Sequence, residues 1–262
     1  MQTVKIAMIA STALFAATSA GFAAPLVGLT GDKTLVMLDT DNLAAGGTVE
    51  VTGVDRLVGI DWRPANNTLI GVTAENTIVT IDPMTGEATE LSTMDTPLDI
   101  GDAPVVVDFN PMADRLRYMT GTTNHRVNVD TGEVTVDGEL TFDAAEMHAG
   151  ETPAIVAAAY INSHGKPEVT AMYNVDATIG ALIQQTSPND GTLAAIGTFG
   201  IAEPAETYAF DVQTTEDGTN TAWLVNGATL YTVDLETGAA TEAGAISGVE
   251  GAIRDIAVMP AG

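Results

Sequence analysis

Residues 58–64 read Val-Gly-Ile-Asp-Trp-Arg-Pro, and related strands follow them at intervals of about fifty residues. Each of these strands begins a unit in which a turn, a second strand and a third strand ending in aspartate precede Thr-Gly. The related strands are Val106 to Pro111, Ala158 to Asn162, Ala209 to Gln213 and Ile256 to Pro260, the last of which stands alone at the C-terminus. Short strands repeated at this period predict a β-propeller.

Apolar and polar residues alternate within each unit with a period of two, and no segment has an apolar stripe at helical spacing. The chain is therefore expected to be all-β. Second strands are predicted at 69–73, 115–120, 168–173 and 221–225, third strands at 77–82, 126–130, 181–186 and 229–234, and fourth strands at 88–91, 134–136, 193–197 and 240–245.

The N-terminal unit has no first strand of its own. Its second, third and fourth strands are predicted at 26–30, 34–39 and 48–52. The C-terminal strand at 253–259 can supply the missing one, and this pairing would remove the sheet edges that an open array leaves exposed. The sequence thus predicts a five-bladed β-propeller closed by pairing of the C-terminal strand with the N-terminal blade.

The first residues have the pattern of an export signal. Lys5 precedes an apolar run from 6 to 17, and small residues follow around 20–24. The run is shorter than the roughly 20 apolar residues that cross a bilayer, so a membrane anchor fits less well. We expect a signal peptide at 1–24 with cleavage near 20–24, then a single propeller domain at 25–262. The mature protein is expected to be periplasmic or extracellular, without a membrane span.

The chain is strongly acidic, with 35 Asp and Glu against 9 Lys and Arg and a formal charge of −26. Nucleic acids and anionic lipid surfaces are bound through Lys and Arg, so the composition excludes nucleic-acid binding. Two explanations of the acidity remain open: solubility in a salty medium, or the binding of divalent cations.

Aspartate recurs before the turns between the third and fourth strands. These turns begin at Asp39, Asp82, Asp130 and Asp234. An Asp side chain can accept a hydrogen bond from the backbone two residues on, and the glycine of Thr-Gly supplies a positive φ. We therefore expect a local structural role for these four aspartates rather than a catalytic or calcium-binding one.

Several of these motifs together resemble a known family. They are Gly59 to Pro64, Val107 to Pro111 with the following Asp114 to Arg117, Val156 to Tyr160, and Leu230 to Gly238. Over nearly all of the mature chain they resemble an exported bacterial family known only as domain-of-unknown-function family 4394. The resemblance implies no established activity and no assigned site residues.

Three aspartates, Asp61, Asp108 and Asp211, occupy similar places on the first strands of three units. Each points away from its apolar neighbours, because successive side chains of a strand face opposite sides. The first strand of a propeller blade lines the axis, so these carboxylates are expected to converge there and to suit Ca²⁺, which takes six to eight oxygen ligands. The alternative is that each accepts a backbone N–H of a neighbouring blade or pairs with an arginine, the candidates being Arg63, Arg115, Arg117 and Arg254.

An enzymatic alternative uses the same three aspartates, since propeller-type glycoside hydrolases carry catalytic carboxylates on inner strands. However, no glutamate lies on a predicted inner strand, and aromatic residues make up only 5% of the chain. The sequence has no cysteine, and His125, His148 and His164 lack metal-site spacing and are expected on the surface. The leading hypothesis is therefore a non-enzymatic binding or scaffold protein.

The connections between blades are expected to emerge on one face and to make it acidic. They carry Asp95, Asp99, Asp102, Asp143, Glu146, Glu151, Glu203 and Glu206. Loops on a rigid scaffold often carry function, so this face is the predicted contact surface for a protein, a glycan or a small molecule, with a plain solvated rim as the alternative.

Overall fold

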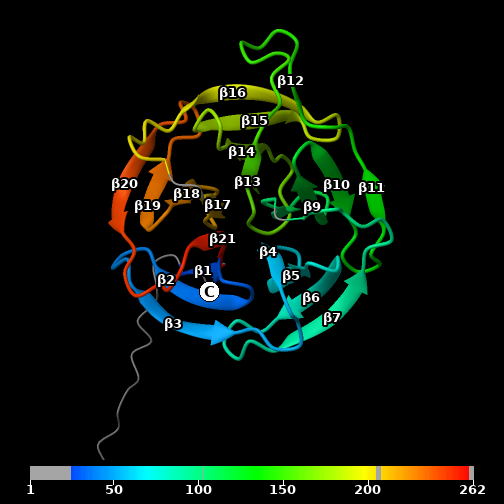
Figure 1. The fold of residues 1–262 in the computed structure, drawn as a ribbon, viewed down its shortest axis with the longest axis vertical. Helices are drawn as coiled ribbons and strands as arrows, with labels where there is room; N and C mark the ends of the chain where they lie inside the picture. Colours follow the sequence, from blue (N-terminus) through cyan, green and yellow to red (C-terminus); the bar gives the residue numbers. More distant parts are fainter. Residues whose placement is uncertain (1–24, 102, 205–207, 260–262) are drawn as a thin grey trace, which may run out of the picture.

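The computed structural model describes residues 25–101, 103–204 and 208–259, and the predicted signal peptide lies outside this range. Five sheets, antiparallel except for the short β12 in one of them, are arranged around a central axis, each with its first strand innermost (Figure 1). The predicted five-bladed, all-β propeller is thus confirmed. Within the described residues, no helix is long and apolar enough to cross a membrane.

We number the blades 1 to 5 along the ring and give their strands from the axis outward. Blade 1 consists of β21 (Ile253–Val258), β1 (Pro25–Thr30), β2 (Thr34–Asp39) and β3 (Ala45–Glu50). Blade 2 consists of β4 (Leu57–Arg63), β5 (Thr68–Thr73), β6 (Thr77–Ile81) and β7 (Ala88–Thr93), and blade 3 of β8 (Val106–Asn110), β9 (Arg115–Thr120), β10 (Thr123–Val127) and β11 (Val134–Val136). Blade 4 consists of β13 (Ile155–Tyr160), β14 (Met172–Asp176), β15 (Ala181–Ser187), β16 (Thr192–Thr198) and the short β12 (Thr141–Phe142), and blade 5 of β17 (Tyr208–Thr214), β18 (Asn220–Asn226), β19 (Thr229–Val233) and β20 (Ala240–Ala245).

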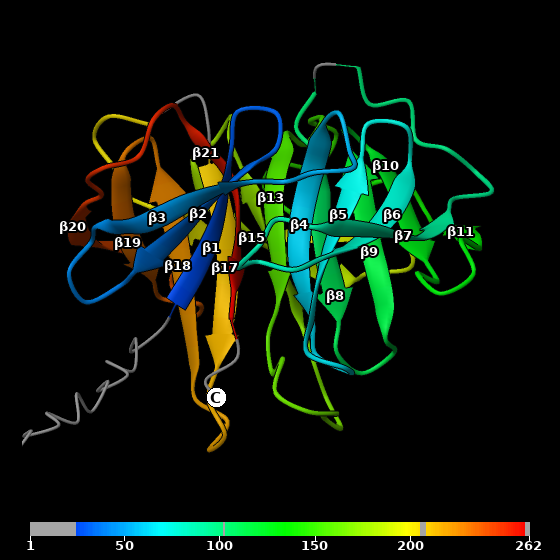
Figure 2. The same ribbon diagram turned by 90° about the horizontal axis from the view of Figure 1, so that it is seen from below.

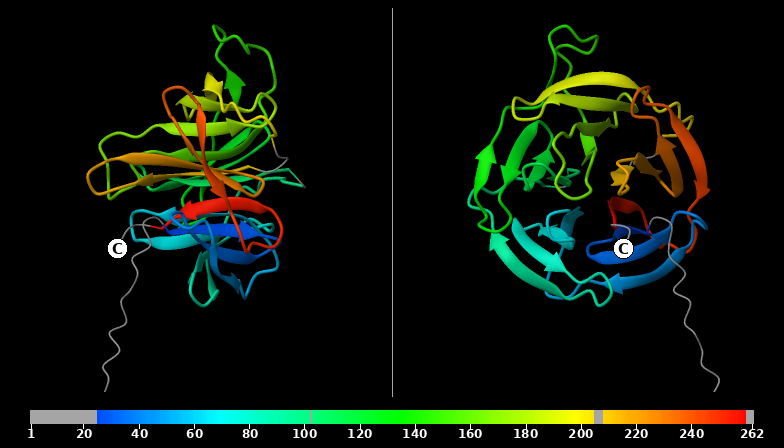
Figure 3. Two further views of the ribbon diagram at one scale, coloured as in Figure 1. Left: turned by 90° about the vertical axis from the view of Figure 1, so that its left-hand side faces the viewer. Right: turned by 180° about the vertical axis from the view of Figure 1, so that it is seen from behind.

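The C-terminal strand closes the ring as predicted. Strand β21 pairs antiparallel with β1, with Leu26 opposite Val258 and Gly28 opposite Ile256, so red and blue strands lie side by side in Figure 3. Ile253 and Ile256 are each only 2% exposed and pack into the apolar cluster shared by blades 1 and 5. The two ends of the chain therefore build one blade, whose stability depends on both.

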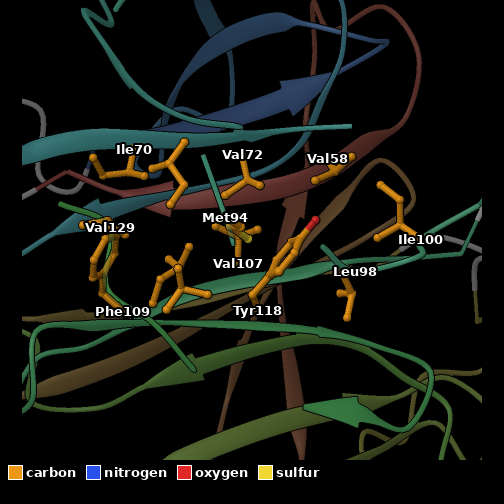
Figure 4. Close-up of a cluster of buried hydrophobic side chains, with 13 residues drawn as sticks. Val58, Ile70, Val72, Met94, Leu98, Ile100, Val107, Phe109, Tyr118 and Val129 are labelled. Atoms are coloured by element: carbon orange, nitrogen blue, oxygen red, sulfur yellow. The ribbon is translucent and has the colours of Figure 1, made fainter. Parts of the chain in front are cut away.

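The hydrophobic core is divided among the junctions between blades. In Figure 4, Phe109 and Tyr118 of blade 3 face Ile70 and Val72 of blade 2. Met94, Leu98 and Ile100 join this cluster from the connection between the two blades. Asn76 holds the same connection, because its side chain accepts the Leu98 N–H at 2.9 Å.

The structure corrects the positions of several strands and one turn. In blade 1, β3 spans Ala45–Glu50 instead of the predicted 48–52. The third strand of blade 3 ends at Val127 instead of Asp130, because Asn128 starts the turn and accepts the Gly132 N–H at 2.8 Å. Asp82 and Asp234 begin the corresponding turns of blades 2 and 5 and also accept local backbone N–H groups. The expected turn role of Asp130 is therefore wrong, since Asn128 takes that place.

In blade 4, the predicted strand 168–173 is also displaced, since β14 spans Met172–Asp176. The β13–β14 loop includes Asn162 at φ 62° and a side-chain hydrogen bond from Asn162 to the Val169 carbonyl. Because the loop has this internal structure, the second strand begins only at Met172. Strand β12 was not predicted; it pairs in parallel with β16 and adds a fifth strand to the blade.

The two faces of the ring carry different connections, as the side view in Figure 2 shows. One face, called here the turn face, carries the turns that follow the inner strands, including the β13–β14 and β17–β18 loops. The opposite face, called here the connection face, carries the segments that lead from one blade to the next. The predicted acidic residues belong to those segments, except that Asp102 and Glu206 lie outside the described residues.

Candidate functional site on the propeller axis

The structure brings Asp61, Asp108 and Asp211 together, as the alternation of the inner strands predicts. One carboxylate oxygen from each lies within 4.8 Å of the others, and all three side chains are buried. They come from β4, β8 and β17, so three separate blades contribute to a single cluster. Neighbouring apolar residues such as Ile60 and Phe109 pack into the inter-blade core instead.

Each of these aspartates also accepts a hydrogen bond from the inner strand of the next blade. Asp61 accepts the Phe109 N–H at 2.7 Å, and Asp108 accepts the Tyr160 N–H at 2.9 Å. Asp211 accepts the Val258 N–H at 2.6 Å, which ties blade 5 to the closing strand. The backbone alternative raised by the sequence is thus confirmed as part of what these side chains do.

The arginine alternative is wrong, because the four arginines have other partners. Arg63 forms paired hydrogen bonds with Asp114 and Asp130, and Arg117 bonds Asp137 at 2.7 Å. The remaining two donate to backbone carbonyls: Arg115 to Ala113 and Asp114, and Arg254 to Gly31, Asp32 and Leu57. Because Asn128 begins the turn, Asp130 is not needed there, and its carboxylate instead binds Arg63 across the junction between blades 2 and 3.

Sequence reasoning missed a fourth axial carboxylate, Asp255 on β21. Asp255 accepts the Ile60 N–H at 2.8 Å and thereby ties blade 1 to blade 2. Gly59 makes the approach possible, since a Cβ there would lie 3.0 Å from the Asp255 carboxylate and 2.5 Å from Val107. The sequence contained one indication of this residue. The side chains of residues 255 and 257 lie on the same face of β21, and Ala257 occupies the position in this strand that is equivalent to Asp61, Asp108 and Asp211.

No salt bridge joins any of the four axial aspartates to a Lys, Arg or His of the described residues, and only Asp255 has a nearby basic charge that lowers its pKa, that of Arg254. Burial, followed by the charge of Asp211, raises the pKa of Asp61 well above its usual value, and burial with the charge of Asp61 does the same for Asp108. Burial raises the pKa of Asp211 to about 6 and that of Asp255 to about 8. The cluster thus favours bound protons or a bound cation.

A small cavity adjoins the three aspartates. Its volume is about 40 Å³, which suffices for a water molecule or an ion. Both oxygens of Asp61 and of Asp211 accept backbone N–H groups, whereas only one oxygen of Asp108 has such a partner among the described residues. Asp108, whose side chain is only 4% exposed, therefore keeps one carboxylate oxygen that could face a ligand in the cavity.

The cavity opens on the turn face, beside Ser163, His164, Gln213 and Thr214. Loop β13–β14 is fixed there by Ser163, whose N–H donates to the Thr214 hydroxyl at 2.9 Å. Asn162 and Asn220 bond each other reciprocally at 2.9 and 2.8 Å. These contacts hold the junction between blades 4 and 5, where Ala159 stands at the level of the axial aspartates. The cavity therefore lies opposite the acidic connection face.

One of the three histidines, His125, does not lie on the surface where it was expected. His125 is buried at 3% exposure in β10, so its predicted surface position is wrong, and burial lowers its pKa. It lies there because residues 123–127 form a strand whose neighbours on β9 and β11 cover it. His164 is exposed at the cavity mouth, and His148 contacts Glu151 at 3.0 Å.

In metal-free protein, we expect stability to fall as the pH rises. The folded-state pKa values of Asp211 and Asp255 are raised to about 6 and about 8. The protonated side chains therefore contribute fully to the free energy of unfolding below the unfolded-state pKa of about 4. This contribution is lost as the pH rises through the folded-state pKa values. The melting temperature in chelator should be lower at about pH 9 than at about pH 5. Asp255→Asn should reduce the difference; an unchanged pH slope in that variant would contradict the assignment.

The chain belongs to domain-of-unknown-function family 4394, whose model matches residues 34–257. The resemblance of its inner-strand and turn motifs to this family is thereby confirmed. No curated protein matches the chain.

The chain is similar to solved structures with which it shares little sequence. A protein of unknown function from Bacteroides thetaiotaomicron VPI-5482 is 16% identical with a TM-score of 0.51, and the match covers 93% of this chain and 66% of that one. A protein of unknown function from Bacteroides caccae is 12% identical with a TM-score of 0.45, covering 87% and 76%. A luciferin-regenerating enzyme is 12% identical with a TM-score of 0.48, covering 80% and 68%. The first of these similarities shows a shared fold, and none of the three carries an activity to this chain.

Proposed function

We propose that the protein is an exported, non-enzymatic propeller that acts as a binding or scaffold module and holds a divalent cation on its axis. The supporting observation is the convergence of Asp61, Asp108 and Asp211 within 4.8 Å beside a cavity of about 40 Å³, without a basic partner among the described residues. Buried carboxylates without compensation are costly, and a cation would remove that cost.

Calcium is the cation that this donor set fits best. Ca²⁺ prefers oxygen ligands and tolerates irregular geometry, so three carboxylates from separate strands are acceptable to it. Water can complete the coordination from the cavity, which opens to solvent beside His164. The backbone hydrogen bonds of Asp61 and Asp211 orient their carboxylates from outside the cluster. The inner strands would thus supply both the ligands and their support.

Calcium is expected to raise the melting temperature of chelator-treated protein beyond a sodium control of equal ionic strength. A ligand at about a hundredfold excess over Kd adds about 2.7 kcal/mol, which for a domain of this size corresponds to roughly 5 to 10 °C. Replacing Asp61, Asp108 and Asp211 by Asn should abolish the calcium-specific part. Asp82→Asn, at a turn remote from the axis, serves as the control. A wild-type protein without a calcium-specific shift would refute the axial site.

Purified protein is expected not to hydrolyse glycans. The cavity beside the carboxylates is much smaller than a sugar ring, and its volume of about 40 Å³ leaves no room for a glycosidic bond between them. Reducing-sugar release from a panel of polysaccharides measures this directly. Reproducible release that disappears in Asp61→Asn, Asp108→Asn and Asp211→Asn would favour the glycoside hydrolase alternative and overturn the non-enzymatic proposal.

The proposal that the protein is exported rests on its N-terminal sequence. The acidic connection face is the proposed contact surface for a protein, a glycan or a small molecule. The connection between blades 2 and 3 is fixed by Met94, Leu98 and Ile100 in the core, so its acidic residues are presented on an anchored segment. The segment that follows β12 protrudes beyond the outline of the ring (Figure 1), and its sequence includes Asp143, Glu146 and Glu151. These features support a rigid binding surface.

A further inference from the structure

Within the described residues, carboxylates on the inner strands connect neighbouring blades at four of the five junctions of the ring. Each accepts a backbone N–H from the inner strand of the next blade, and they belong to Asp61, Asp108, Asp211 and Asp255. The junction between blades 4 and 5 differs, because Ala159 occupies the equivalent position on β13. The Val212 N–H, which a carboxylate at 159 would accept, donates instead to Asp211 of its own strand at 2.6 Å. Blades 4 and 5 therefore meet at this level through the apolar side chains of Ala159 and Phe210.

Four residues close the same junction on the turn face, and we call them the clasp: Asn162, Ser163, Thr214 and Asn220. The N–H groups of Asn162 and Ser163 donate to the side chains of Asn220 and Thr214, both at 2.9 Å. The Asn220 side chain donates in return to that of Asn162 at 2.8 Å. All four residues are partly exposed, whereas the bonds from Asp108 and Asp211 to the next blade are buried. Water can replace hydrogen bonds at an exposed site, so the clasp opens at a lower cost than the carboxylate contacts.

The clasp lies at the mouth of the axial cavity. Ser163 and Thr214 line this cavity together with the three aspartates that contribute to its polar wall. The cavity thus extends from the carboxylates to the junction that Ala159 leaves without an axial carboxylate contact. Far from the axis, the same junction is held by the backbone, since the Ala240 N–H donates to the Phe199 carbonyl at 3.0 Å. A movement at the clasp can therefore open the inner part of the junction while its outer part stays paired.

We infer that blades 4 and 5 separate transiently at the clasp, and that this movement admits water and ions to the axial cavity. The cavity has a volume of about 40 Å³, so its occupant is no larger than a water molecule or an ion and needs only a small displacement of the β13–β14 loop. For ions the inference rests on the proposed cation site, whereas for water it does not. One measurement in chelator and one with calcium test these two parts separately.

Amide hydrogen exchange of the protein in chelator, resolved by NMR, tests the opening itself. Val212 and Trp62 form a matched pair, because each N–H donates to the preceding aspartate of its own strand at 2.6 Å. They differ in their junctions, since Asp255 holds β4 to blade 1 whereas Ala159 leaves β17 without the equivalent contact. We expect the protection factor of the Val212 N–H to be lower by about tenfold or more, although Val212 is the more buried residue. Equal or higher protection of Val212 would refute the opening.

Asn220→Ala removes both hydrogen bonds between Asn162 and Asn220 and is expected to make opening more frequent. It should lower the protection of the Val212 N–H by about a further tenfold and leave the Phe109 N–H, at the junction between blades 2 and 3, unchanged. The matched control is Asn110→Ala, since Asn110 also accepts two backbone N–H groups on the turn face, both within its own turn. Equal effects of the two substitutions on Val212, or an equal loss of protection at Val212 and Phe109, would overturn the inference.

Calcium exchange measures the passage of the ion. Calcium-loaded protein is mixed with a fluorescent chelator in a stopped-flow instrument, and calcium binding to chelator-treated protein is followed in a second series. Asn220→Ala should release and bind calcium about tenfold faster or more, with Kd within about threefold of wild type, because the clasp changes the path and not the ligands. An unchanged release rate, or faster release with unchanged binding, would show that ions do not pass the clasp. If wild-type protein binds no calcium, the cation proposal fails, and the hydrogen-exchange result alone confirms or refutes the opening.

Discussion

Protein that lacks residues 251–262 is expected to be unfolded or aggregated. The deletion removes β21, the innermost strand of blade 1, together with the buried side chains of Ile253 and Ile256. Each fully buried aliphatic side chain contributes roughly 1.5 to 3 kcal/mol, and a whole domain is stable by only about 5 to 15 kcal/mol. The deletion also removes Asp255 and the Val258 N–H, so blade 1 loses hydrogen bonds to both neighbouring blades.

Circular dichroism during heating and size-exclusion chromatography measure this outcome. Deletion of residues 260–262 alone is the control, because it leaves β21 intact, and this shorter truncation should melt like the full chain. A second test replaces Ile256 by Asp, which puts an unpaired charge into the cluster shared by blades 1 and 5. A cooperative melt at unchanged temperature after removal of 251–262 would show that the ring does not depend on this strand.

Arg117→Ala is expected to destabilise the protein by about 3 to 5 kcal/mol, because it leaves a buried carboxylate without its main partner. Arg117 is 2% exposed and donates to Asp137 at 2.7 Å and to Asn124 at 2.8 Å. It also donates to the Tyr160 hydroxyl, which belongs to blade 4. Asp137 keeps only Arg126, whose side chain is more exposed, as a charged partner.

Urea denaturation of wild type and variant measures the loss. The matched control is Arg115→Ala, two residues earlier on the same strand, whose guanidinium donates hydrogen bonds to the nearby carbonyls of Ala113 and Asp114. This control should change stability by no more than about 0.5 kcal/mol. Equal effects of the two substitutions would show that the junction between blades 3 and 4 does not depend on the buried ion pair.

Local sequence patterns determined the blades, their number and their closure. Alternation with a period of two assigns each inner-strand residue to one side, which is why Asp61, Asp108 and Asp211 were expected to share a surface. The absence of a first strand in the N-terminal unit, together with an unpaired strand at the C-terminus, predicted the pairing of β21 with β1. Alternation depends on residues that are neighbours along the chain, and the closing pair follows from counting the strands of each unit. Both can therefore be read from the sequence.

Contacts between blades were decided only by the tertiary structure. The sequence does not state how far apart two inner strands lie, so it could not show that Asp255 reaches the Ile60 N–H or that Asp130 reaches Arg63. It also placed the expected contact surface on the acidic connections, whereas the cavity beside the axial aspartates opens on the turn face. The physical reason is that packing between blades sets these distances, and packing depends on side chains roughly fifty or more residues apart.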